Sequence, residues 1–198
     1  MEPSLCLRES DGHHPINQNQ FLIVFKFAVE FVAIYPSVNA DQTDARLDPL
    51  FAQLKSITDH RHGTELSNLI WTIWLEVDDI EARQHLHDGM IAMDRGESGS
   101  ALQHFSNLIQ RSPGFAEGWN RRATLHYLRG DYAASARDIK QTLLLEPRHF
   151  GALSGLGLIM MRLRAPDAAI VAFAKALAVN PHAANVRYHL EQLRNRVQ

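Results

Sequence analysis

Histidine is the residue type in this 198-residue chain that most invites a metal site, because eleven are present. His85 and His87 are two positions apart in a segment of helical periodicity, so their side chains do not share a helix face. His60 and His62 fall in a predicted turn and could chelate one ion, but no acidic residue or cysteine accompanies them at ligand spacing. The sequence therefore predicts no metal site, and we interpret the histidines as surface or interface residues.

Other catalytic patterns are missing from the sequence. It contains no Gly-x-Ser-x-Gly, no phosphate-binding Walker loop and no Gly-x-Gly-x-x-Gly. Gly151, Gly155 and Gly157 lie in a predicted helix, where they suit close packing better than phosphate binding. Asp78 and Asp79 are adjacent where a predicted helix begins, and acidic side chains are stabilising there. We predict no catalytic residue and no cofactor, and we do not expect an enzyme.

The composition limits the classes of protein to which this chain can belong. Lys and Arg total 20 and Asp and Glu total 22, and hydrophobic residues make up 45%. These values are typical of a globular protein, and the near-neutral charge gives no reason to expect a nucleic-acid partner. The single cysteine excludes an internal disulfide framework.

A regular repeat organises the body of the chain. Pro113, Pro147 and Pro181 are evenly spaced, and they divide the sequence into three blocks of equal length, 82–115, 116–149 and 150–183. Small residues recur at positions 8 and 20 of each block, and a large apolar residue recurs at position 24. In chain order these residues are Gly89, Ala123 and Gly157; Ala101, Ser135 and Ala169; and Phe105, Ile139 and Phe173. Each block shows two apolar-periodic helices, which the small residues allow to approach closely.

This pattern resembles the tetratricopeptide repeat family, and the segment 115–159 is similar to small exported proteobacterial members. The resemblance implies an all-α, right-handed superhelix of three repeats, because one such helix pair cannot bury its own apolar face. Gly130 is expected in the left-handed conformation between the two helices of the second repeat. Residues 184–198 read as a C-terminal capping helix. Residues 41–81 read as an N-terminal capping hairpin with helices at 47–57 and 64–77.

The resemblance also implies a binding surface on the inner face of the superhelix. Carried over position by position, the predicted groove consists of Leu86, Met90, Met93, Asn120, Thr124, Tyr127, Leu128, Leu158, Met161 and Arg162. A methionine-rich strip suits adaptable docking of a peptide or helix. The family's carboxylate clamp is excluded, because its positions hold Leu86, Met90, Arg121, Gly151 and Gly155, of which Arg121 alone could serve. We therefore expect a protein-interaction adaptor or scaffold. An alternative is that the N-terminal segment fills the groove.

Residues 1–40 form a separate part of the chain. Residues 1–20 lack apolar periodicity and are predicted to be disordered, and 21–34 are apolar but too short to span a bilayer. One interpretation is a secretory signal cut before Asp41, which places the protein in the bacterial periplasm or envelope and limits membrane contact to that signal. The alternative is an amphipathic helix docked on the solenoid of a cytoplasmic regulatory or assembly subunit.

Charge is unevenly distributed along the sequence. Residues 41–115 carry 6 basic and 12 acidic residues, whereas 116–198 carry 12 and 6. This asymmetry predicts a charge dipole along the solenoid. Such a dipole favours head-to-tail self-association or electrostatic steering of a bipolar partner.

Overall fold

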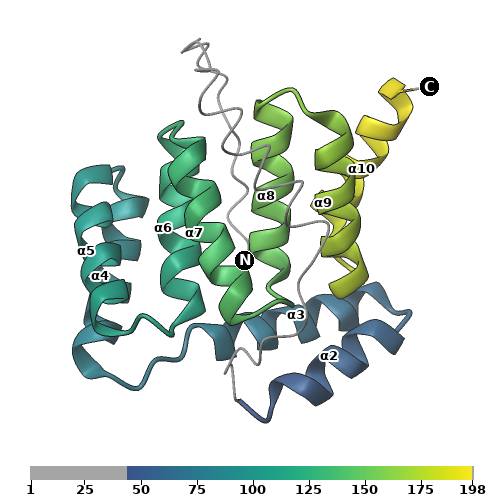
Figure 1. The fold of residues 1–198 in the computed structure, drawn as a ribbon. Coiled ribbons are helices and arrows are strands. Elements are labelled where there is room, and N and C mark those ends of the chain that lie inside the picture. The colour runs from purple at the N-terminus through teal and green to yellow at the C-terminus, as the bar shows by residue number, and fades with distance from the viewer. Residues whose placement is uncertain (1–43, 198) are drawn as a thin grey trace.

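The computed structural model describes residues 44–197, and all regular structure in that range is helical (Figure 1). The all-α solenoid expected from the repeat period is confirmed. The helices of the described range are α2 Leu47–Ser56, α3 His60–Trp74, α4 Ile80–Asp94, α5 Ser98–Arg111, α6 Ala116–Leu128, α7 Tyr132–Leu145, α8 Phe150–Arg162, α9 Pro166–Val179 and α10 Ala184–Val197.

Three helix pairs correspond to the three sequence blocks. The pairs α4/α5, α6/α7 and α8/α9 stand side by side in chain order, and α10 follows the last of them (Figure 1). Each second helix ends two residues before a repeat proline, at Arg111, Leu145 and Val179. This is expected, because proline disfavours helical geometry in the residue before it and cannot continue the backbone hydrogen bonds.

Small residues at position 8 make room for the large residue at position 24. A Cβ on Gly89 would lie 2.6 Å from the Phe105 ring, and a Cβ on Gly157 would lie 2.4 Å from the Phe173 ring. Both phenylalanines are fully buried. In the second repeat, Ser135 Oγ instead donates to the carbonyl of Ala123 at 2.7 Å. The residues at positions 8, 20 and 24 of each block therefore allow the paired helices to pack closely.

The turn inside each repeat places one residue in the left-handed region. Gly96 and Gly130 have φ values of 74° and 77°, and Arg164 has a φ of 57° at the equivalent place in the third repeat. Glycine adopts this conformation freely, whereas a residue with a Cβ is strained there. The prediction for Gly130 is confirmed.

The α2–α3 hairpin does not stack in front of the first repeat. Its apolar residues form a cluster with Phe150 at the start of α8, and Val179 at the end of α9 packs against that cluster. Figure 1 shows α3 crossing beneath the repeats. Helix α3 also begins four residues earlier than expected, because Asp59 caps it by accepting from the Arg61 N–H at 3.1 Å. His60 and His62 therefore lie on a helix, where residues two apart do not share a face.

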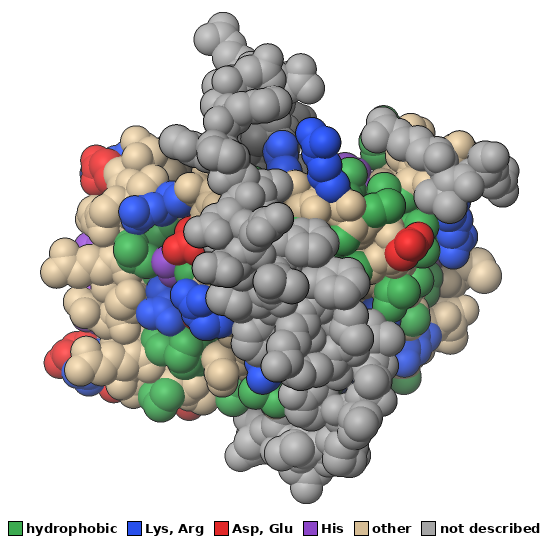
Figure 2. Space-filling view, turned by 45° about the horizontal axis from the view of Figure 1, so that its top comes forward, with side chains coloured by type: hydrophobic (Ala, Val, Ile, Leu, Met, Phe, Trp, Pro, Cys, Tyr) green, Lys and Arg blue, Asp and Glu red, His purple; other side chains and the backbone are tan. Residues whose placement is uncertain are grey.

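The α2–α3 hairpin carries little of the acidic excess of the N-terminal half. Residues 44–74 contain four acidic and three basic residues, whereas 75–111, which lead into the first repeat and form it, contain seven and three. Within the hairpin, Asp48 Oδ1 is 2.5 Å from Arg148 Nη1 of the basic C-terminal half. On the face shown in Figure 2, acidic and basic side chains are interspersed. The charge dipole and the head-to-tail association stay predictions.

The interpretations of residues 1–40, including cleavage before Asp41, lie outside the described residues. Between residues 44 and 197, no helix is long and apolar enough to cross a membrane.

Candidate functional site

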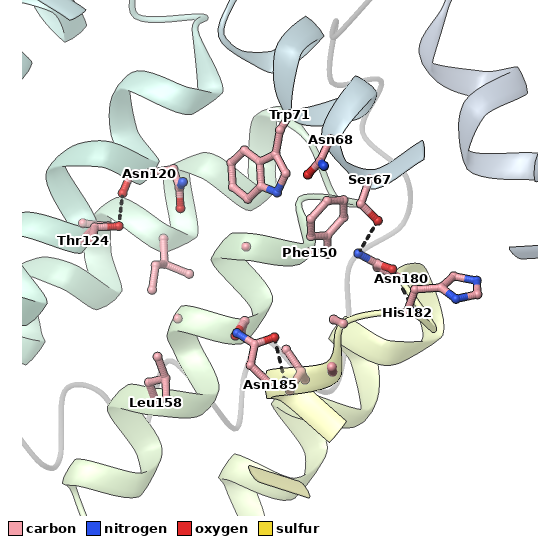
Figure 3. Close-up of a pocket in the computed structure, with 18 of the residues that line it drawn as sticks. Ser67, Asn68, Trp71, Asn120, Thr124, Phe150, Leu158, Asn180, His182 and Asn185 are labelled. Atoms are coloured by element: carbon pink, nitrogen blue, oxygen red, sulfur yellow. Dashed lines mark hydrogen bonds between the residues drawn. The ribbon is translucent and has the colours of Figure 1, made fainter. Parts of the chain in front are cut away.

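A chamber of about 760 Å³ lies between the first helices of successive repeats. Helix α8 forms its floor, α6 and the start of α10 form its sides, and α3 closes one end (Figure 3). The volume falls within the range of about 300–1,000 Å³ that is usual for ligand pockets. The described part of the chain therefore contains a concave site large enough for a short peptide segment.

Helix α3 closes the chamber through a stripe of residues four apart. Gly63, Ser67 and Trp71 share one face because four residues are close to one helical turn. A Cβ on Gly63 would lie 2.2 Å from His182 Cγ, so only glycine permits this approach. Ser67 Oγ accepts a hydrogen bond from Asn180 Nδ2 at 3.0 Å, and both residues are buried.

Trp71 completes this closure by lying over the backbone of α8. A Cβ on Gly151 would lie 2.6 Å from Trp71 Cη2. The Trp71 ring makes edge contacts with Trp74, His149 and Phe150 at centroid distances of 5.3–5.4 Å. Aromatic contacts of this geometry stabilise beyond the area they bury. Trp71 is therefore held as a fixed wall of the chamber.

A buried polar network connects α3, α6 and α8 behind the chamber. His149 Nδ1 accepts the backbone N–H of Ala152 at 3.1 Å, which leaves Nε2 to donate to Glu117 Oε2 at 3.0 Å. Asn120 Nδ2 donates to the same oxygen at 2.9 Å, and Arg121 Nε lies 2.6 Å from Glu117 Oε1. The His149 ring is stacked on Trp74 with centroids 4.1 Å apart. The network thus fixes the start of α8 against both neighbouring helices.

Burial on its own would raise the pKa of Glu117, which is 1% exposed. The charge of Arg121 and the hydrogen bond from His149 outweigh that effect, so the pKa lies below its ordinary value. Glu117 is therefore a buried carboxylate that neutralises Arg121.

Comparison with known proteins matches these repeats to one family. The sequence model of the tetratricopeptide repeat matches residues 89–141 and 129–185. The chain belongs to the tetratricopeptide repeat family. It is 37% identical over 115 residues to a tetratricopeptide repeat-containing protein of Rhizobium etli, and the match covers 58% of this chain and 56% of that protein. The chain thus spans about half the length of the curated relative it matches.

Solved tetratricopeptide repeat domains share the fold at low sequence identity. The Sgt2 domain from Aspergillus fumigatus has a TM-score of 0.57 at 20% identity, with 61% of this chain and 82% of that chain covered. The first such domain of Spaghetti (RPAP3), solved with the HSP90 peptide SRMEEVD, has a TM-score of 0.58 at 16% identity, with 61% and 96% covered. These two similarities show that the fold is shared.

Four residues of the predicted groove line the chamber in this tetratricopeptide repeat protein: Asn120, Thr124, Tyr127 and Leu158. Arg162 is next to them, because its Nε donates to Tyr127 Oη at 3.2 Å. Leu128 is 53% exposed and does not line the chamber. Met161 packs against the core of the second and third repeats.

The first repeat contributes nothing to this chamber. Leu86 is 5% exposed and belongs to the core cluster around Phe105, and Met90 and Met93 pack against that cluster. A binding role for the methionine-rich strip stays a prediction. The family's carboxylate clamp has no equivalent here, since Glu117 engages Arg121 and Trp71 covers Gly151.

Sequence reasoning missed the part of the chamber contributed by α3, by the loop before α10 and by the start of α10. These residues include His60, Asn68, Trp71, Asn180, His182 and Asn185. One signal was present, since Gly63, Ser67 and Trp71 show the spacing of a close-packed helix face. Metal chemistry has no support in the described range, where no group of three histidine, cysteine or acidic side chains could hold an ion.

Proposed function

We propose that this protein is an interaction adaptor that binds a peptide or a short helix in the chamber. The observation that carries the proposal is the chamber itself, a concave site of about 760 Å³ between α6, α8, α10 and α3. Its lining mixes aromatic and aliphatic side chains with amides and hydroxyls, which is typical of sites that bind by shape and fix orientation by a few polar contacts. The peptide in the Spaghetti (RPAP3) structure supports the same kind of ligand.

Preorganisation supports binding at this site. The Glu117–His149 network and the aromatic contacts of Trp71 hold three walls in place without a ligand. A preformed site loses less conformational entropy on binding than a flexible one, so more of the contact energy appears as affinity. We propose no catalytic role for these residues.

Affinity capture from the native cell extract, with matched variants, tests the proposal. Leu158→Arg places a charge in the chamber, whereas Gln103→Arg places the same charge on the exposed face of α5. We expect a partner that wild type and Gln103→Arg retain and that Leu158→Arg loses, with all three proteins equally helical by circular dichroism. A partner retained equally by all three would place binding outside the chamber.

We also propose that the protein works in the bacterial periplasm or envelope after removal of a signal before Asp41. The apolar segment 21–34 and the small residue Ala40 support this proposal. N-terminal sequencing of protein from the envelope fraction should begin at or near Asp41. Mature protein that retains residues 21–34 would contradict it.

A further inference from the structure

We infer that the chamber selects an uncharged internal peptide segment with an apolar side chain, and not an acidic chain terminus. This inference rests on the proposed function, because it assigns the chemistry of the ligand at the same site. It is carried by the absence of charge in the chamber lining, by the loss of the clamp positions, and by the polar groups that remain available.

No described residue that lines the chamber is a Lys, Arg, Asp or Glu. His60 and His182 are the titratable side chains of that lining, apart from the Tyr127 phenol, and their rings make a tilted contact at a centroid distance of 5.7 Å. A charged ligand side chain that entered the chamber would lose its hydration without gaining a charged partner. Such a transfer is strongly unfavourable, so the chamber discriminates against charged side chains.

The arginines near the chamber contact other residues. Arg121 is held by Glu117, whose side chain is fully buried. Gly151 supplies no side chain, and the space above it is filled by Trp71. Arg162 lies beside Tyr127 and is not part of the lining. An acidic tail would therefore find no cation inside the chamber.

The available polar groups suit a peptide backbone. Within the described part of the chain, the side chains of Asn68 and Ser154 make no hydrogen bond, and Asn185 uses only its oxygen, which accepts from the Val186 N–H. Figure 3 shows Asn68 at the end of the chamber closed by α3, and Asn185 at the side formed by α10. Side-chain amides both donate and accept, which matches the donor and acceptor of a peptide group.

Apolar side chains complete the lining beside these amides. Trp71, Phe150 and Leu158 provide the apolar surface, and Gly155 leaves space above the floor. A neutral segment with a leucine or phenylalanine would therefore bury its side chain here while the amides bind its backbone.

Fluorescence anisotropy with defined peptides tests the inference. The probes are N-acetylated, C-amidated hexapeptide mixtures with one central residue fixed as Leu, Phe, Glu or Lys. The peptide SRMEEVD is measured with a free and with an amidated C-terminus. The proteins are the full chain, Ser154→Arg, Thr124→Arg and the control Gln103→Arg.

We expect the Leu and Phe mixtures to bind at least tenfold more tightly than the Glu and Lys mixtures. Ser154→Arg and Thr124→Arg should each weaken this binding at least tenfold, whereas Gln103→Arg should not change it. The two forms of SRMEEVD should bind equally weakly. Tighter binding of the Glu mixture or of free-acid SRMEEVD, lost in Ser154→Arg, would overturn the inference and leave the proposed function standing. If no probe binds, or if Ser154→Arg and Thr124→Arg leave binding unchanged, the proposed function and the inference both fail.

Discussion

Gly151→Ala is the substitution that most sharply probes the docking of α3 on the repeats. The new Cβ would lie 2.6 and 2.8 Å from two atoms of the Trp71 ring, closer than packed carbon atoms tolerate. The ring cannot move freely, because Trp74, His149 and Phe150 contact it. Gly155→Ala in the same helix is the matched control, since its Cβ would meet only Ile139 Cδ1 at 3.3 Å.

Two opposing effects set the change in the free energy of unfolding for each variant. Alanine is favoured over glycine inside a helix by about 1 kcal/mol. Overpacking of a filled site costs about 1–3 kcal/mol. Gly155→Ala should therefore stabilise by up to about 1 kcal/mol, and Gly151→Ala should range from neutral to a loss of about 2 kcal/mol.

Urea unfolding, followed by circular dichroism and tryptophan fluorescence, measures both variants. In a Trp71→Ala background the clash disappears, so Gly151→Ala should become stabilising. The coupling between the two substitutions should be about 1–3 kcal/mol, whereas Gly155 and Trp71 should couple weakly. If Gly151→Ala stabilises as much as Gly155→Ala and shows no coupling to Trp71, then α3 does not dock as described.

Three further perturbations test other parts of the structure. Phe173→Ala should lower the free energy of unfolding by about 3–5 kcal/mol in urea titration, because a fully buried ring is removed; a loss below about 1 kcal/mol would contradict its core position. Arg164→Gly should raise the thermal midpoint, since glycine removes strain of about 1–2 kcal/mol at a φ of 57°; a lower midpoint would argue against strain there. Glu117→Gln should lower stability at pH 7 by about 2 kcal/mol, because the charged hydrogen bonds are lost. The pKa of Glu117 is lower in the folded state than in the unfolded state, so the carboxylate contributes its full stabilisation above the unfolded pKa of about 4.3 and loses that stabilisation progressively as the pH falls below this value. A difference in stability between wild type and Glu117→Gln that is unchanged from pH 7 to pH 3 would contradict this assignment.

The repeat architecture could be predicted because it depends on residues that are close to one another in the sequence. A helix pair, its turn and its proline all lie within one repeat, so small residues such as Gly157 identify their partner Phe173 by spacing alone. The same alignment of the three sequence blocks predicted the face that lines the chamber, which includes Asn120, Thr124, Tyr127 and Leu158.

The placement of α3 could not be predicted in this way. It depends on contacts such as Ser67 with Asn180, which are 113 residues apart and belong to no repeat. The segment around Gly63 resembles a loop because glycine is unfavourable in helices. The residue is glycine because His182 packs against its backbone, which only the tertiary structure reveals.

Site-specific photo-crosslinking tests the central claim most directly, namely that the chamber closed by α3 is the peptide-binding site. A benzoylphenylalanine is placed at Leu158, which lines the chamber, or at Leu128, which is exposed outside it. The protein is then illuminated with the tightest-binding neutral peptide or with a captured partner. Crosslinks from position 158 and none from position 128 are the predicted result. Crosslinks from 128 and none from 158 would contradict the assignment of the chamber as the binding site.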